Sequence, residues 1–238
     1  MKTNSNDFAW QYLVLAVLVV GALAGMYLLN QQLVVPQVRL QNFVLNWNSL
    51  QRFIYDGPSP YSSAVFEDTS RKVIARGTFA GEMEALHLPL NTLLFYLPFA
   101  WMEDFSMAAA VWLVFVELAL GTVIVLTLSR LEGSMPRWYY LPMLFFFLLW
   151  QPLYASIASG AELIIQMALI LLGLHMLEQF SDEYAGLLFA FAFFNLEIFG
   201  LFYLTLAIWI AVKGRWNVLA GFGAVSYTHL TLPTILLV

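Results

Sequence analysis

Three acids and one histidine interrupt or flank long apolar stretches, which is where polar side chains are least expected. Glu117 lies in the middle of the apolar run 106–129. In a membrane such an acid costs roughly 2.5–3.5 kcal/mol, and by default it marks a functional site. The alternative is a protonated acid that hydrogen-bonds a neighbouring helix and serves packing only. The sequence leaves both interpretations open.

Glu162 and Glu197 lie at breaks between apolar segments, in the strings SGAELIIQ and FFNLEIFG. Helices break at membrane depth where their backbone lines a cavity, so both acids are candidates for a polar cavity. The alternative is a plain turn at the membrane surface. His87 opens the string HLPLNTLLFYLPFA and is a candidate contact for a phosphate or a sugar; alternatively it is only a polar residue at a helix entry.

A second set of charged residues fills the polar segment 30–84. It holds five of the ten basic residues and five acids, which are Arg39, Arg52, Arg71, Lys72 and Arg76 with Asp56, Glu67, Asp68, Glu82 and Glu84. Cations usually favour the cytoplasmic side, but a loop of nearly 60 residues carries little weight in that rule. We expect this segment to be one large extracytoplasmic loop that bears short helices.

The composition indicates what must position these residues. The chain is 61% hydrophobic and 11% charged, whereas soluble domains are about 45–50% apolar and about 25% charged. We therefore predict an all-α fold, a polytopic transmembrane helical bundle. Cysteine is absent, and no metal cluster, Walker loop, dinucleotide fingerprint or nucleophile elbow is found. No cofactor, no metal and no nucleic-acid partner are predicted.

The first span is expected over 8–29, after a short polar tail. A signal peptide is the rival interpretation, but the stretch exceeds the usual apolar core of about 7–15 residues and no A-x-A cleavage motif follows. Further apolar segments follow at 85–102, 106–129, 138–161, 163–177 and 184–212. Strict alternation would place Arg130 and Arg137 on the same side as the large loop, against the positive-inside tendency. One of the proline-broken segments is therefore a candidate re-entrant segment.

Residues 225–234, VSYTHLTLPT, resemble the translation of a sequencing-library adaptor. We therefore expect 1–224 to be a truncated transmembrane domain and 225–238 to be an artefactual tail that replaces the natural continuation. The alternative is a natural tail. An uninterrupted genomic reading frame that encodes these residues would refute the artefact.

The string NFVLNWNSLQRFIYDGPSPY over 42–61 resembles a signature of bacterial GT-C membrane glycosyltransferases, and most closely that of glycosyltransferase family 87. Family members read D-F, an aromatic residue, and G-x-x-P-Y, which here correspond to Asn42-Phe43, Trp47 and the segment ending at Tyr61. Weaker matches follow in order, at His87-Leu88-Pro89-Leu90, Ala108–Trp112, Gly160-Ala161 and the element from Ala185-Gly186 to Asn195-Leu196-Glu197. The resemblance covers about 41–224.

This resemblance implies transfer of a mannose-like hexose from a polyprenyl phosphate to a lipid or glycan acceptor outside a bacterial inner membrane, as part of cell-envelope assembly. It also implies a general base at the family Asp position, which is Asn42 here, and an amide cannot take the acceptor proton as a carboxylate can. Asp56, Glu82 and Glu84 are therefore candidate replacements. Arg52 and Arg76 are candidate phosphate partners, because arginine binds phosphate bidentately; ordinary loop charge is the alternative.

The predicted site residues thus form two groups. The catalytic candidates are Asn42, Asp56, Glu82 and Glu84, and the substrate-binding candidates are Arg52, Tyr61, Arg76, His87, Glu117, Glu162, Asn195 and Glu197. Two other functions stay open. A catalytically inactive scaffold subunit would explain why Asn42 and Asn195 replace charged family residues. A transporter would explain the broken helices, but no internal repeat supports it.

Overall fold

The computed structural model describes residues 5–57, 59–60, 62–75, 90–131, 136–179, 181–194 and 196–225. Within these ranges the chain is helical and contains no strand, which confirms the predicted all-α class. The helices are α1 (Ser5–Leu29), η1 (Asn30–Val34), α2 (Gln41–Asp56), α3 (Ser63–Ala75), α4 (Leu90–Ala100), α5 (Phe105–Leu131), η2 (Arg137–Tyr139), α6 (Tyr140–Leu149), α7 (Gln151–Ser159), α8 (Glu162–Glu178), α9 (Asp182–Phe191) and α10 (Leu196–Lys213). A further short helix spans Trp216–Val225.

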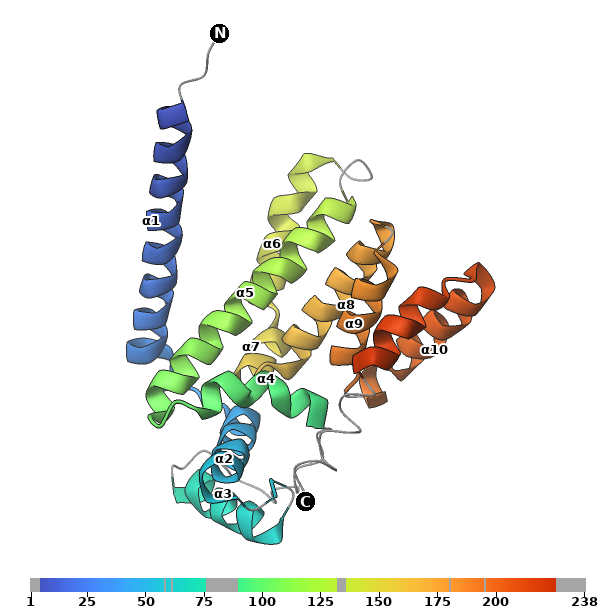
Figure 1. Ribbon diagram of the computed structural model, residues 1–238. Helices are drawn as coiled ribbons and strands as arrows, with labels where there is room; N and C mark the ends of the chain where they lie inside the picture. Colours follow the sequence, from blue (N-terminus) through green and yellow to red (C-terminus); the bar gives the residue numbers. More distant parts are fainter. Residues whose placement is uncertain are drawn as a thin grey trace.

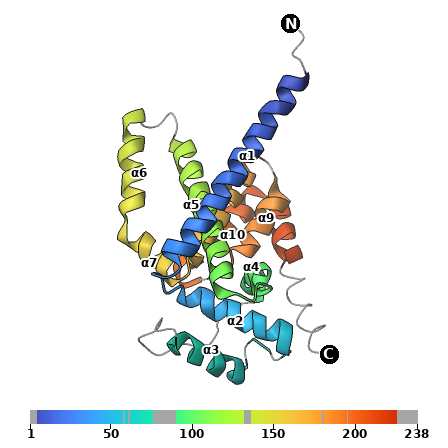
Figure 2. The same cartoon turned by 90° about the vertical axis from the view of Figure 1, so that its left-hand side faces the viewer.

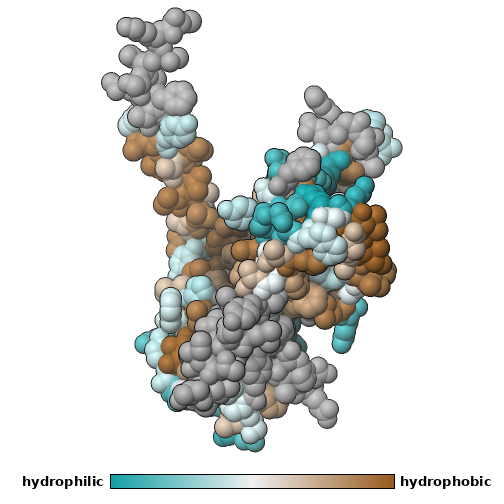
Figure 3. Space-filling view, turned by 45° about the vertical axis from the view of Figure 1, so that its right-hand side comes forward, coloured by the Kyte–Doolittle hydropathy of each residue, from teal (hydrophilic) through white to brown (hydrophobic). Residues whose placement is uncertain are grey.

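Three helices of the described chain are long and apolar enough to cross a membrane: Tyr12–Val34, Phe105–Leu131 and Leu196–Lys213. A fourth candidate span is the bent pair α6 and α7, whose axes differ by 47°. The first span stands away from the bundle along most of its length (Figure 1). Its surface is covered by exposed apolar side chains (Figure 3), as expected of a helix that faces lipid.

The helices define two opposite ends of the molecule. Both side views place α2 and α3 at one end of the molecule. The N-terminal end of α1 and the C-terminal end of α5 lie at the other end (Figures 1 and 2). Between them, α4 has 11 residues and contains Pro98, so it is about 16 Å long and too short for a hydrocarbon core of about 30 Å. It packs against α2 and stays at the α2 end.

An α4 that does not cross the membrane would remove the inconsistency found in the sequence. If α4 does not cross, α5 runs from the α2 end back to the end where α1 begins. Arg130 then lies at the α1 end of the molecule, opposite α2 and α3. In the described part of the segment 85–102, which is residues 90–102, the helix is too short to cross a membrane by itself. The bent pair α6 and α7 is either a broken span or a re-entrant loop.

The larger core cluster joins α2, α4, α5 and the start of α8 around stacked aromatic rings. The ring of Trp112 lies 5.1 Å from that of Phe43 and 4.7 Å from that of Tyr96. Both buried indoles of this cluster are satisfied, since Trp112 Nε1 donates to the carbonyl of Gly160 at 3.0 Å and Trp47 Nε1 to that of Phe99 at 2.9 Å. The bond of Trp47 therefore ties α2 to α4, and the bond of Trp112 ties α5 to the turn between α7 and α8.

The smaller core cluster joins the end of α8 to α9, α10 and the helix Trp216–Val225. Gly186 of α9 and Gly221 let two backbones come into direct contact, because a Cβ on either would overlap a carbonyl oxygen of the other helix. The break between α9 and α10 is bound by the fully buried Gln166, whose Nε2 donates to the carbonyls of Ala192, at 2.8 Å, and Phe194.

Candidate functional site

A buried polar cluster lies where α2, α4 and α8 meet. The carboxylate of Glu162, which is the first residue of α8, accepts three hydrogen bonds from neutral side chains. Asn46 Nδ2 and Tyr96 Oη donate to Oε1 at 2.8 and 2.7 Å, and Asn42 Nδ2 lies 3.5 Å from Oε2. Glu162 is 9% exposed, while Asn46 and Tyr96 are each 1% exposed. Asn42 is half-buried and is the outermost member of the cluster.

Unusual backbone conformations bring these side chains together. Leu40, just before α2, and Ala161, just before α8, both have positive φ, at 44° and 61°, and Gly160 has φ of 129°. The amide of Leu40 donates to the carbonyl of Ala158 at the end of α7, 2.8 Å away. Such conformations cost energy in non-glycine residues and persist where the surrounding packing determines them, often at functional sites. They point the first turns of α2 and α8 at each other.

The carboxylate of Glu162 is held without a cation. Among the described residues its hydrogen-bond partners are all neutral, and the position at the first turn of α8 adds the favourable field of a helix N-terminus. The two short bonds fix Oε1, whereas Oε2 has, from the residues that the structure describes, only the long contact to Asn42. Asn46 Oδ1 is also buried and has no hydrogen-bond partner in the described part of the chain. The cluster therefore keeps acceptor capacity for a proton or a hydroxyl group.

The residues predicted on α2 lie in two separate places. Asn42 belongs to the Glu162 cluster, but Arg52 and Asp56 form an ion-pair group with Asp68 of α3. Arg52 Nε and Nη2 donate to Asp68 at 3.0 and 2.8 Å, and Nη1 donates to Asp56. Hydrogen bonds to Asp56 and then Asp68 raise the pKa of Arg52. This guanidinium is thus engaged in holding α3 on α2.

The intramembrane acid Glu117 accepts a hydrogen bond from Asn30 Nδ2 at 3.2 Å. Asn30 is 2% exposed and begins η1, a π-helical turn that continues α1. The contact ties the end of α1 to α5, as the packing interpretation of Glu117 expects. Glu197 is exposed on the first turn of α10. The predicted residues Tyr61, Arg76, Glu82, Glu84, His87 and Asn195 lie outside the described residues.

Two members of the cluster were missed by reasoning from the sequence. Asn46 follows Asn42 by one helical turn, and this spacing could have identified it once 41–56 was read as a helix. Tyr96 lies within an apolar string and gives no such signal, since only the packing of α4 on α2 brings its hydroxyl to Glu162.

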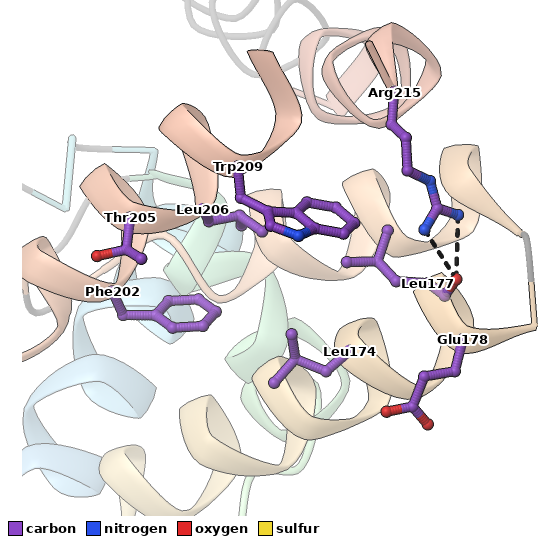
Figure 4. A pocket seen from close by; sticks show the side chains of 8 residues that line it. All are labelled: Leu174, Leu177, Glu178, Phe202, Thr205, Leu206, Trp209 and Arg215. Carbon is purple, nitrogen blue, oxygen red and sulfur yellow. Dashed lines mark hydrogen bonds between the residues drawn. The ribbon is translucent and has the colours of Figure 1, made fainter. Parts of the chain in front are cut away.

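A pocket of about 430 Å³ opens at the other end of α8, lined by Leu174, Leu177, Glu178, Phe202, Thr205, Leu206, Trp209 and Arg215. Figure 4 shows Arg215 directed at the carbonyl of Leu177, and both Nη atoms donate to that oxygen at 3.0 Å. Arg215 also pairs with Asp182 and lies 5.5 Å from the centre of the Trp209 ring. Its bonds are those of a structural arginine that joins helix ends.

The fold and the buried acid together define a helical membrane protein with a polar site at one end. The family model of glycosyltransferase family 87 matches residues 87–238, so the chain belongs to this family. Membership implies a membrane glycosyltransferase with a sugar donor and an acceptor. The match includes Tyr96 and Glu162, and it also includes 225–238, for which the artefactual tail stays a prediction. No curated protein and no solved structure matches the chain.

Proposed function

We propose that this protein transfers a hexose, mannose-like, from a polyprenyl-phosphate donor to a lipid or glycan acceptor outside the inner membrane of a bacterium. The observation that carries the proposal is the buried Glu162 cluster in a chain of a glycosyltransferase family. The acceptor hydroxyl would attack the anomeric carbon directly, and the polyprenyl phosphate would leave with the bonding electrons. Such a displacement needs a proton acceptor and hydrogen-bond donors for the phosphate.

The distribution of basic residues supports an extracytoplasmic site. Arg130 pairs with Glu178 at 2.9 Å, and Arg215 pairs with Asp182, so both arginines lie at the end of α8 opposite Glu162. Cationic residues near membrane helices favour the cytoplasm. This end would therefore be cytoplasmic, and α2, α3 and the Glu162 cluster would lie on the outer side, where a lipid-linked donor meets its acceptor. The protein would then cross the membrane several times.

The experiment is sugar transfer by the full-length protein in proteoliposomes. Radiolabelled mannosyl polyprenyl phosphate is supplied with a bacterial lipid extract as acceptor, and a nucleotide-linked mannose is tested in parallel. We expect label in an acceptor product with the lipid-linked donor only. Transfer from the nucleotide-linked sugar alone would refute the choice of donor, and absence of transfer with either donor would refute the proposed activity.

The loop acids are candidates for the proton acceptor that Asn42 does not supply. Of these, Asp56 is engaged by Arg52, while Glu82 and Glu84 belong to the same large loop. In the transfer assay, loss of activity in Glu82→Gln or Glu84→Gln, but not in Glu67→Gln, would assign the role to that loop acid. Glu67 is a suitable control because it is an exposed acid of α3 that faces Arg71.

The amide at Asn42 also favours a second candidate function, an inactive scaffold subunit of an envelope-assembly complex. A scaffold would bind its donor or partner without turnover. Binding of mannosyl polyprenyl phosphate to the purified protein, with no transfer to any acceptor fraction, would favour this function. A transporter would instead move the lipid-linked sugar across the vesicle membrane without breaking its anomeric bond.

A further inference from the structure

Glu162 differs from the described acids of α2 and α3 in how its charge is balanced, and from the exposed Glu103 and Asp104 in its burial. Asp56 and Asp68 are paired with Arg52, and Glu67 faces Arg71. Asp104 accepts the backbone amide of Met107 at the start of α5, at 2.8 Å. Among the described residues, the side chains that donate to Glu162 are all neutral. A carboxylate that no cation neutralises keeps more of its tendency to take a proton.

The two oxygens of Glu162 are not equivalent. Oε1 is fixed by Asn46 and Tyr96, two bonds that set the orientation of the group. Oε2 faces the half-buried Asn42 across 3.5 Å, which is at the limit of a hydrogen bond. A hydroxyl that enters on the Asn42 side could take the place of this long contact at little cost. A rigid group with one open lone-pair direction is what a general base requires.

We propose that Glu162 is the general base of this protein and that Asn42 orients the acceptor hydroxyl over it. This inference rests on the proposed transferase function. The acceptor O–H bond breaks and its proton passes to Oε2, while the acceptor oxygen forms a bond to the anomeric carbon. The bond from that carbon to the phosphate oxygen breaks, and the electron pair leaves with the polyprenyl phosphate. The protonated carboxyl group then returns its proton to solvent or to the released phosphate.

The geometry also accounts for Asn42 as an amide. A carboxylate at position 42 would face the carboxylate of Glu162 at about 3.5 Å, and two like charges so close cannot both ionise without a large cost. An amide instead donates one hydrogen bond to Oε2 and can accept one from an incoming hydroxyl. In this pair, Glu162 of α8 therefore supplies a negative charge, and Asn42 of α2 supplies an amide dipole.

The test exchanges the two groups in the full-length protein. Glu162→Gln keeps the size of the side chain, and we expect it to lower kcat about 100-fold or more with little change in KM, since general base catalysis contributes roughly 10²–10⁴-fold. The double variant Asn42→Asp/Glu162→Gln returns a carboxylate to the same pair of positions, and we expect it to recover at least about a tenth of the lost rate. Glu67→Gln, the same change on the exposed face of α3, should retain wild-type kcat.

Each outcome is decisive for one of the two proposals. If the wild-type protein transfers sugar and the folded Glu162→Gln variant does so equally well, the base assignment is wrong while the transferase function stands. A variant counts as folded when it gives a monodisperse profile in detergent. If Glu162→Gln does not fold, the folded double variant decides. The base assignment is then wrong if the double variant shows no transfer activity. If the wild-type protein shows no transfer from any donor, the transferase function itself fails, and the base with it.

Discussion

Asn42 Nδ2 lies 3.5 Å from Glu162 Oε2, although 120 residues separate the two in the chain. The contact joins the first turn of α2, in the large loop, to the first turn of α8, in the bundle. Through this contact, the large loop contributes a side chain to a buried site. What this pair does chemically depends on which of its members carries the charge.

The variant Asn42→Asp tests the charge balance of the pair. The new carboxyl group would lie beside Glu162, so it should stay protonated to higher pH than a free carboxyl group. The folded state then binds more protons than the unfolded state, and stability falls as pH rises. We expect the Tm of the variant to drop relative to wild type between about pH 5 and about pH 8.

The matched control is Gln41→Glu, which adds the same charge at the neighbouring half-buried position. That acid lies in the first turn of α2, where the helix field is favourable. Thermal unfolding in detergent, followed by tryptophan fluorescence at several pH values, measures both variants. An Asn42→Asp variant with the same pH dependence as Gln41→Glu would show that the two groups do not sense each other.

Tyr96→Phe removes one of the two short hydrogen bonds to Glu162 Oε1 and leaves the stacked ring in place. Loss of a hydrogen bond to a buried charged group costs about 1.5–3 kcal/mol. We expect a lower Tm and a lower kcat, because the carboxylate is then oriented by Asn46 alone on that side. Tyr55→Phe is the control, since its exposed hydroxyl makes only a 3.5 Å contact with the carbonyl of Trp101. Equal changes of Tm and kcat in Tyr96→Phe and Tyr55→Phe would argue that the hydrogen bond from Tyr96 to Oε1 does not orient the carboxylate.

The sequence predicts the fold class of this protein better than it predicts the contacts of the candidate site. The helical class follows from composition alone, because a chain so poor in charge must face lipid. Glu162 stands out as an acid at a break between apolar runs, whereas Asn42 is singled out only by its position in the family signature. Their contact could not be predicted, because it depends on left-handed conformations at Leu40 and Ala161, which are rare in residues other than glycine. The sequence likewise does not predict that α4 is too short to cross the membrane, because this follows from its length and its packing on α2 in the structure.

The contact between α9 and the helix Trp216–Val225 gives a test of the second core cluster. A side chain at Gly186 would overlap the carbonyl oxygen of Val218, and small residues at such crossings let membrane helices approach closely. We expect Gly186→Leu to prevent correct packing and to reduce the yield of monodisperse protein severely. Gly223→Ala should be tolerated, because nothing lies within 4 Å of a Cβ there. Normal yield and Tm for Gly186→Leu would show that the two helices do not pack in this way.

Gly160 controls how closely α2 approaches the loop between α7 and α8. A Cβ at this position would lie 2.9 Å from the backbone nitrogen of Phe43 and 3.2 Å from Cβ of Asn42, and the φ of 129° is itself strained for any other residue. Gly160→Ala must therefore push the start of α2 away from Glu162. The shift lengthens a contact between Asn42 and Glu162 that is already long, and we expect transfer activity to fall at least about tenfold, since small misplacements are costly in catalysis.

The control is Gly57→Ala, where φ is also positive, at 83°, but a Cβ meets nothing within 4 Å. This control separates backbone strain from displacement of α2, because both variants carry the strain and only Gly160→Ala moves the helix. The expected result is a larger loss of Tm in Gly160→Ala than in Gly57→Ala, with activity lost only in Gly160→Ala. Full activity in a folded Gly160→Ala variant would mean that the approach of α2 to α8 does not set the site.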